Sequence, residues 1–196
     1  MDWPVELRGV TESVVTTLGP NDRWNVAALG LHVDGEGNAI ADGDRPVRAR
    51  TWGRTRTRRN FTERGDGYVQ FTRDPVDFTE AALAVREEPE PVLDSADAWV
   101  RVTVERAEEG EAGGTSWVDW QLHPEEAAVE RETVPTTNRG HGAVIEATVA
   151  ASRLDVDAYD TAELRDRLDY FADVVERCGG PRERAALARL RELVEW

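Results

Sequence analysis

The sequence predicts an α+β protein that is mainly β, with an antiparallel barrel, a few added helices and a C-terminal helical hairpin. Three observations lead to this fold class. Six or seven short segments rich in β-branched and aromatic residues lie between turn clusters before Pro135. Only brief helical segments interrupt them, and amphipathic segments dominate the chain after Pro135. We therefore expect a barrel domain over residues 1–135 and a helical region over 136–196 that packs on the barrel.

Two strands are expected in the first part of the chain. Residues 5–18 are rich in β-branched side chains and are followed by the turn cluster 19–22. Residues 24–33 form a nearly continuous run of apolar and small residues, which is typical of a strand covered on both faces. A hairpin loop at 34–38 then leads toward a third strand at 47–52.

Two short helices with a strand between them are expected next. The first helix has Thr55 or Thr57 as its N-cap and ends near Arg64, because glycines follow. The strand covers residues 68–72. The second helix begins at Asp74-Pro75, a capping residue followed by a proline at the first helical position.

The remaining strands are expected from residue 99 onward. Residues 87–94 are rich in proline and acidic residues, and we expect a linker there that no regular element crosses. Residues 99–105 alternate strictly between apolar and polar side chains, as a half-buried strand does. A loop at 108–115 connects them to a strand at 116–123, and a last strand lies within 127–134.

Three helices are expected in the C-terminal region. The first falls within 136–154 and has Thr137 as its N-cap. The second begins at Asp160 in a capping-box arrangement and ends at Gly179. The third begins at Pro181, and together with the second it forms the predicted antiparallel hairpin.

Acidic residues dominate the composition. The chain has 39 Asp and Glu against 24 Lys and Arg, all of them Arg, so its formal net charge is −15. Such a surface repels nucleic acid, and acid excess without lysine is typical of halophilic proteins. The N-terminus lacks the features of a signal sequence, and no apolar run approaches the ~20 residues that span a bilayer. We expect a cytoplasmic, halophilic protein without membrane or nucleic-acid partners.

Several kinds of catalytic motif are absent from the sequence. His32, His123 and His141 lie in different expected elements, and Cys178 has no cysteine partner. The GxGxxG, P-loop and GxSxG motifs are also missing. We expect no metal site and no dinucleotide fold, and no residue stands out as a general acid or base.

The most distinctive stretch is an arginine cluster over residues 45–64. This window holds eight arginines and one acid, Glu63, and therefore carries +7. The arginines are Arg45, Arg48, Arg50, Arg54, Arg56, Arg58, Arg59 and Arg64. Thr55, Thr57 and Asn60 lie among them at the expected start of a helix. Guanidinium groups, hydroxyls and free backbone N–H groups are together the components of a phosphate site.

A structural explanation of the arginine cluster stands beside this one. The arginines could balance the acidic surface through exposed ion pairs, each worth about 0–1 kcal/mol. The interleaved threonines and asparagine favour a ligand, because ion pairing alone does not require them. The sequence therefore predicts an anion site before Phe61.

Five segments together resemble an archaeal family of uncharacterised proteins with the flavin-reductase-like, FMN-binding split barrel. They are residues 11–17, 24–31, 48–61, 68–78 and 138–154, in the same order and at compatible spacing. The resemblance implies a homodimeric split β-barrel that holds FMN at the subunit interface. It also implies that the C-terminal helical region takes part in that interface.

The resemblance implies a set of cofactor-binding residues. These are Asn25, Arg50, Trp52, Thr55, Thr57, Arg58, Asn60, Asn138 and Arg139. Arg50, Thr55, Thr57 and Asn60 are expected around the FMN phosphate, Asn25 near the ring, and Asn138 and Arg139 on the interface side. Family members tend to have a small residue at Arg54 and an aromatic at Arg58, which leaves the roles of individual arginines open. Trp52 stands where the family often has another aromatic, which keeps a stacking role open.

The leading functional hypothesis is therefore an FMN-binding flavoprotein, either an FMN-dependent oxidoreductase or a protein that carries FMN. NADH or NADPH is a candidate electron donor. The alternative is a non-catalytic module in which residues 45–64 bind a polyanion or an acidic protein. A third hypothesis places another flat cofactor, such as a deazaflavin or haem, in the same cleft.

Overall fold

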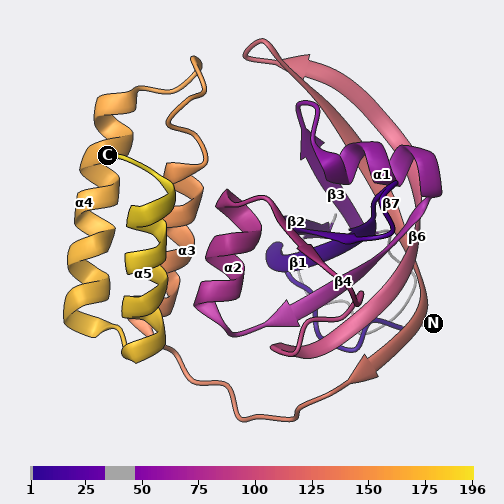
Figure 1. Ribbon diagram of the computed structural model, residues 1–196, viewed down its shortest axis with the longest axis horizontal. Coiled ribbons are helices and arrows are strands. Elements are labelled where there is room, and N and C mark those ends of the chain that lie inside the picture. The colour runs from indigo at the N-terminus through magenta and orange to yellow at the C-terminus, as the bar shows by residue number, and fades with distance from the viewer. Residues whose placement is uncertain (1, 34–46) are drawn as a thin grey trace. The chain divides into compact units, whose positions relative to one another are not determined.

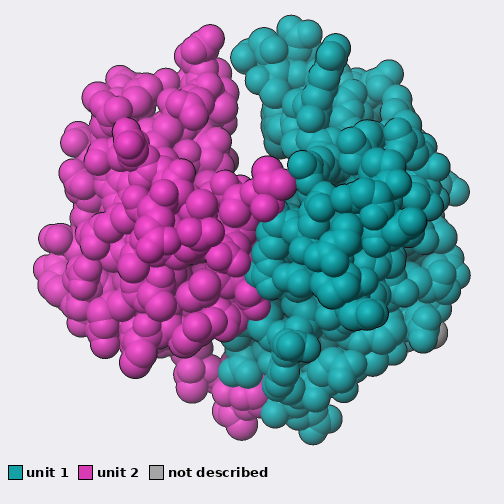
Figure 2. Space-filling model, in the orientation of Figure 1, with its two compact units in different colours: residues 1–73, 86–132 teal, residues 74–85, 133–196 magenta. Residues whose placement is uncertain are grey.

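The computed structural model describes residues 2–33 and 47–196 (Figure 1). The expected hairpin loop at 34–38 and Arg45 lie outside the described residues. The chain forms two compact units, coloured separately in Figure 2. Unit 1 comprises Met1–Arg73 and Arg86–Glu132, and unit 2 comprises Asp74–Val85 and Thr133–Trp196. Each unit has its own hydrophobic core, and a domain boundary at residue 135 stays a prediction.

Unit 1 is a closed barrel of six antiparallel strands. Around the barrel they follow the order β1, β4, β6, β7, β3, β2, and the pairing of β1 with β2 closes the ring. Their bounds are β1 Val10–Leu18, β2 Trp24–Val33, β3 Val47–Trp52, β4 Asp66–Thr72, β6 Ala96–Ala112 and β7 Thr115–Val129. A three-residue strand, β5 Arg86–Glu88, extends the sheet beside the start of β2. The predicted fold class, mainly β with added helices, is confirmed.

Strand periodicity separates the core of the barrel from its outer face. The inward-facing residues of β3 and β7 are Val47, Ala49, Thr51, Val118, Trp120 and Leu122, all buried. Because successive side chains of a strand point to opposite faces, Arg48, Arg50 and Trp52 face outward. The α1 helix, Arg56–Arg64, follows β3, and its Phe61 packs edge-on against Trp120 in the core.

The β6–β7 hairpin is longer than the sequence suggests, and it forms a curved ribbon along one side of the barrel (Figure 1). Its strands pair as far as Ala112 and Thr115, so the expected loop at 108–115 is wrong. Two glycines, Gly113 and Gly114, have positive φ and make the whole turn. The separate strand expected at 127–134 is also wrong, because β7 runs unbroken to Val129.

Unit 2 consists of four helices. They are α2 Pro75–Leu83, α3 Arg139–Ala151, α4 Thr161–Cys178 and α5 Pro181–Leu193. Asp74 and Asp160 cap α2 and α4 as expected, but Asn138 rather than Thr137 caps α3. Although α2 comes from the middle of the barrel sequence, it packs against α3 and α5. Among the described residues, none of the helices combines the length and the apolar character that crossing a bilayer requires.

Candidate functional site

The junction between β3 and α1 leads the chain from the barrel wall into a helix whose first turn contains no acidic residue. Gly53 leaves the strand with φ of 65°, while its N–H donates to the carbonyl of Ser116 on β7 at 2.7 Å. The Thr55 hydroxyl then accepts from the backbone N–H of Arg58 at 3.2 Å and caps the helix. The first turn of α1 has no acidic residue, so the positive end of the helix dipole is not neutralised within the helix.

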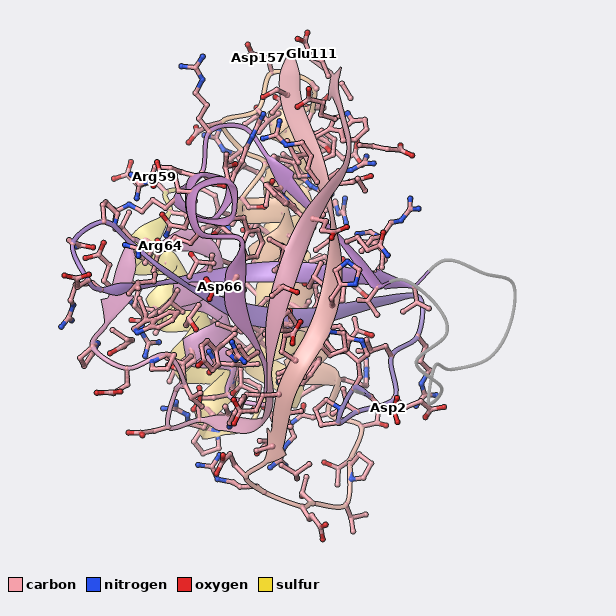
Figure 3. The ribbon with its side chains drawn as sticks, turned by 90° about the vertical axis from the view of Figure 1, so that its right-hand side faces the viewer. Asp2, Arg59, Arg64, Asp66, Glu111 and Asp157 are labelled. Atoms are coloured by element: carbon pink, nitrogen blue, oxygen red, sulfur yellow. The ribbon has the colours of Figure 1, made fainter. Side chains whose placement is uncertain are left out.

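A surface hollow of about 560 Å³ lies beside this helix start. Its lining residues are Arg54, Thr55, Arg56, Arg58, Arg59, Thr62, Glu63 and Ser116. All but Ser116 come from α1 or the two residues before it. Figure 3 labels two arginines of α1, Arg59 and Arg64. Of these two, only Arg59 lines the hollow. We refer to these eight lining residues as the anion hollow, because four guanidinium groups face one carboxylate there.

The arginines of the anion hollow differ in how they are held. Arg58 donates from Nη1 to the Gly53 carbonyl at 3.0 Å and to the Ser116 hydroxyl at 2.9 Å. Arg56 donates from Nη1 to Oε1 of Glu87 at 2.6 Å. Arg54 is exposed, and within the described part of the chain it makes no hydrogen bond or ion pair. Arg54 is therefore available to an incoming anion.

A buried layer of polar side chains connects α1 to the barrel behind the anion hollow. Asn60 is 1% exposed and donates from Nδ2 to the Thr17 hydroxyl at 3.0 Å. Its Oδ1 accepts from Nε of Arg59 at 3.3 Å. Asn25 donates from Nδ2 to the Thr57 hydroxyl at 3.4 Å, and both side chains are buried. These bonds fix the position of α1 on the strands.

A second cluster lies on the outer face of β3 and β7. Arg50 makes two hydrogen bonds to Asp119, at 2.6 and 2.7 Å, and its guanidinium stacks 3.9 Å from the centre of the Trp117 ring. Trp52 lies on the same face, 5.5 Å from that guanidinium, and is 46% exposed. The hydrogen bonds to Asp119 raise the pKa of Arg50. Those same bonds hold the pKa of Asp119 below its ordinary value.

Two family models cover most of the chain. The model described as "Protein of unknown function (DUF447) N-terminal domain" matches residues 11–131. The model described as "Protein of unknown function (DUF447)" matches residues 138–192. The chain belongs to the DUF447 family.

Solved structures are similar to this DUF447 protein. The crystal structure of an FMN-bound protein from Methanosarcina mazei, assigned to the same family model, has 22% identity over 96% of both chains and a TM-score of 0.80. This likeness shows a shared fold. Nitrilotriacetate monooxygenase component B from Bacillus cereus has 13% identity over 66% of this chain and 88% of that chain, with a TM-score of 0.44. The styrene monooxygenase flavin reductase from Pseudomonas putida S12 has 13% identity over 62% and 79%, with a TM-score of 0.40. We base no argument about the site on these two structures, because their TM-scores are below 0.5.

The predicted site residues of the DUF447 chain fall into separate groups. Thr55 and Arg58 line the anion hollow, whereas Asn25, Thr57 and Asn60 form the buried layer behind it. Arg50 and Trp52 belong to the outer cluster, and Asn138 and Arg139 form the start of α3 in unit 2. Asn138 caps that helix by accepting from the N–H of Gly140 at 2.8 Å.

Two lining residues of the anion hollow, Thr62 and Ser116, are absent from the sequence-based prediction, whereas Arg59 was named in the arginine cluster but not among the expected cofactor-binding residues. Arg59 and Thr62 line the anion hollow because they follow Thr55 by four and seven residues, which places all three on one helix face. That spacing is a usable signal. Ser116 lies 58 residues from Arg58 and joins the hollow only through the pairing of β3 with β7, which no local pattern reveals. Within the described residues, no cluster of His, Cys, Asp and Glu is arranged to hold a metal ion.

Proposed function

We propose that this protein binds FMN, that the FMN phosphate lies in the anion hollow, and that the bound flavin serves an oxidoreductase reaction. The observation that carries the proposal is the convergence of four guanidiniums, a capping hydroxyl and a helix N-terminus on one hollow. The FMN-bound family member from Methanosarcina mazei supports the choice of FMN over other phosphate esters. When bound, the flavin supplies hydride and one-electron chemistry, as flavin cofactors do.

The charge of the anion hollow suits a phosphomonoester. Its four guanidiniums are offset by Glu63 and by Glu87, which pairs with Arg56 at 2.6 Å, leaving a formal charge of +2. A phosphomonoester carries about −1.5 to −2 at pH 7. In the proposed complex the phosphate contacts three of the lining residues, Thr55, Arg58 and Arg54.

The other expected residues take different parts in the proposal. Asn25, Thr57 and Asn60 position α1 through the buried layer, and Arg50 is committed to Asp119. Trp52 remains a candidate for stacking on a flat ring, since nearly half of it is exposed. In the proposed homodimer, Asn138 and Arg139 contact the flavin. The proposal also includes a cytoplasmic location and NADH or NADPH as the electron donor.

The first test compares FMN with riboflavin, which lacks the phosphate. We expect the wild-type protein to bind FMN at least tenfold more tightly than riboflavin, measured by calorimetry or by flavin fluorescence. Arg54→Gln removes an exposed guanidinium and should weaken FMN binding about tenfold, because a hydrogen bond to a charged group is worth about 1.5 kcal/mol. Riboflavin binding should stay unchanged.

A matched control uses another exposed arginine of unit 1. Arg8 pairs with Glu6 at 3.4 Å and does not line the hollow, so Arg8→Gln should leave both affinities unchanged. Equal affinity of the wild-type protein for FMN and riboflavin would exclude the anion hollow as the phosphate site. Failure to take up any flavin from excess FMN would contradict the whole proposal. Anaerobic addition of NADH or NADPH, followed by the loss of visible flavin absorbance, tests the oxidoreductase part.

The polyanion hypothesis makes the opposite prediction for the same variant. A polyanion contacts many arginines at once, so one neutralised guanidinium lowers its affinity only slightly, and added salt lowers it steeply. The net charge of −15 opposes nucleic-acid binding over most of the surface. Binding of RNA with no preference for FMN over riboflavin would favour this alternative.

A further inference from the structure

Glu87 does not line the anion hollow, but it binds one of the lining arginines and is held by three independent bonds. Its Oε1 accepts from Nη1 of Arg56 at 2.6 Å, and its Oε2 accepts from Nδ2 of Asn21 at 3.0 Å. Its backbone carbonyl accepts from Nη2 of Arg23 at 3.1 Å. The pairing of β5 with β2, in which Glu87 lies opposite Asn25, holds the backbone. Glu87 is thus an ordered negative charge directly behind one of the four lining guanidiniums.

We propose that Glu87 tunes the charge selectivity of the anion hollow, so that it reduces the advantage that diphosphates and triphosphates would otherwise have over a phosphomonoester. This inference rests on the proposed function, because it concerns the ligand of the same hollow. The other nearby carboxylate, Glu63, lines the hollow but is exposed, and solvent screens its charge more strongly.

The electrostatic energy of a ligand in the anion hollow scales with the charge of the ligand. The repulsion between a fixed carboxylate and an anionic ligand grows in proportion to the charge of the ligand. Four guanidiniums without a fixed carboxylate would therefore favour the most highly charged ligand present, such as a nucleoside triphosphate. Glu87 lowers the affinity for such ligands more than the affinity for a phosphomonoester. It leaves a neutral ligand unaffected.

The test is a series of ligands of increasing charge with the full-length Glu87→Gln variant. Gln keeps the shape of the side chain and one oxygen acceptor for Arg56 or Asn21. We expect riboflavin affinity to stay within twofold of the wild type, FMN affinity to rise about threefold, and inorganic tripolyphosphate affinity to rise about tenfold, as one surface charge would produce. Calorimetry measures each affinity, and the melting temperature of the unliganded variant reports on folding.

Glu88→Gln is the matched control. Glu88 lies on the same strand, pairs with Arg86 at 2.8 Å, and its side chain is 30% exposed, compared with 29% for Glu87. Neither glutamate lines the hollow, but Glu87 pairs with the lining residue Arg56, whereas the partner of Glu88 is not a lining residue. This variant should leave the whole ligand series unchanged.

Further outcomes decide the proposal. The double variant Arg56→Gln with Glu87→Gln removes one charge of each sign and should bring the ligand series back to within about twofold of the wild type. An equal change for riboflavin, FMN and tripolyphosphate in Glu87→Gln would overturn the inference and assign Glu87 a structural role only. The inference and the proposed function fail separately: the binding of inorganic phosphate and tripolyphosphate tests Glu87 even if the protein does not bind FMN.

Discussion

At the scale of single residues, the arginines of the cluster owe their roles to their partners and not to their spacing. Arg50 is bound by Asp119, Arg56 by Glu87, and Arg64 donates to the carbonyl of Gly19 at 3.2 Å. Only Arg54 has no such partner within the described part of the chain. The arginine cluster therefore contains two kinds of residue: some arginines form structural ion pairs, and others are candidates for ligand contacts.

The Arg50–Asp119 pair gives a residue-scale prediction with a defined pH dependence. The Asp119 side chain is only 11% exposed, and Asp119→Asn weakens two charged hydrogen bonds. We expect a loss of about 1–3 kcal/mol in the free energy of unfolding at pH 7. Because the pKa of Asp119 is lower in the folded than in the unfolded state, this stabilisation is complete above the unfolded value of about 3.9. It disappears as the pH falls through the folded value.

Urea unfolding of the wild type and of Asp119→Asn at several pH values measures this difference. It should be constant from pH 8 to pH 5 and should shrink below about pH 4. A difference that grew on acidification would contradict the assigned pKa direction. At this scale the sequence narrowed the cap of α1 to Thr55 or Thr57, because capping is local, and the structure shows that it is Thr55. It could not predict the partner of Arg50, since Asp119 lies 69 residues away.

At the scale of elements, local signals located most helix ends but not the longest strands. Asp74, Asp160 and Gly65 each bound a helix as expected. The β6–β7 hairpin was misjudged because Glu108, Gly110 and their neighbours have the composition of a loop. In the structure they form a ribbon whose residues are mostly exposed, where acidic side chains remain solvated. A Cβ atom on Gly110 would lie 2.6 Å from the Trp117 ring, so this glycine is needed for ring packing and not for a turn.

The start of α3 supplies a prediction at the same scale. A Cβ atom on Gly140 would lie 2.4 Å from the Cα of Gly179, which is backbone that follows α4 and cannot easily move. Gly140→Ala should therefore destabilise unit 2 by about 1–3 kcal/mol, as overpacking does. Chemical denaturation followed by far-ultraviolet circular dichroism measures the change.

Gly142→Ala is the control for this prediction. Gly142 lies in the same helix, and nothing lies within 4 Å of the corresponding Cβ position. Alanine is a better helix former than glycine, so this variant should be as stable as the wild type or up to about 1 kcal/mol more stable. Equal destabilisation by both substitutions would show that the contact with Gly179 is not the cause.

At the scale of the whole molecule, sequence order and spatial grouping differ. The segment Asp74–Val85 interrupts the barrel sequence, yet its helix α2 belongs to unit 2. The Asp74-Pro75 signal predicted where α2 begins without showing which core the helix joins. The grouping of elements depends on contacts between distant segments, as between α2 and α5, and no local sequence pattern reveals those contacts.

Charge acts on the molecule as a whole and leads to the last prediction. With a net charge of −15 and no lysine, like charges repel across the surface of the folded chain. Raising the salt concentration from 0.1 to 1 M shortens the screening length from about 10 to about 3 Å, which weakens this repulsion. Salt also weakens the exposed ion pairs, but each of these contributes only about 0–1 kcal/mol. We therefore expect the urea midpoint of the unliganded protein to rise with KCl concentration.

The same salt series should act in the opposite direction on the proposed ligand. Potassium chloride screens the attraction between the anion hollow and the FMN phosphate, so FMN affinity should fall while riboflavin affinity stays nearly constant. The urea midpoint and the FMN affinity are measured on the same samples. The urea midpoint depends on the repulsion among the excess acidic residues of the whole chain. The FMN affinity depends on the local +2 charge of the arginines and glutamates at the anion hollow. A urea midpoint that fell with KCl would show that ion pairs outweigh repulsion, and would contradict the prediction of a halophilic surface.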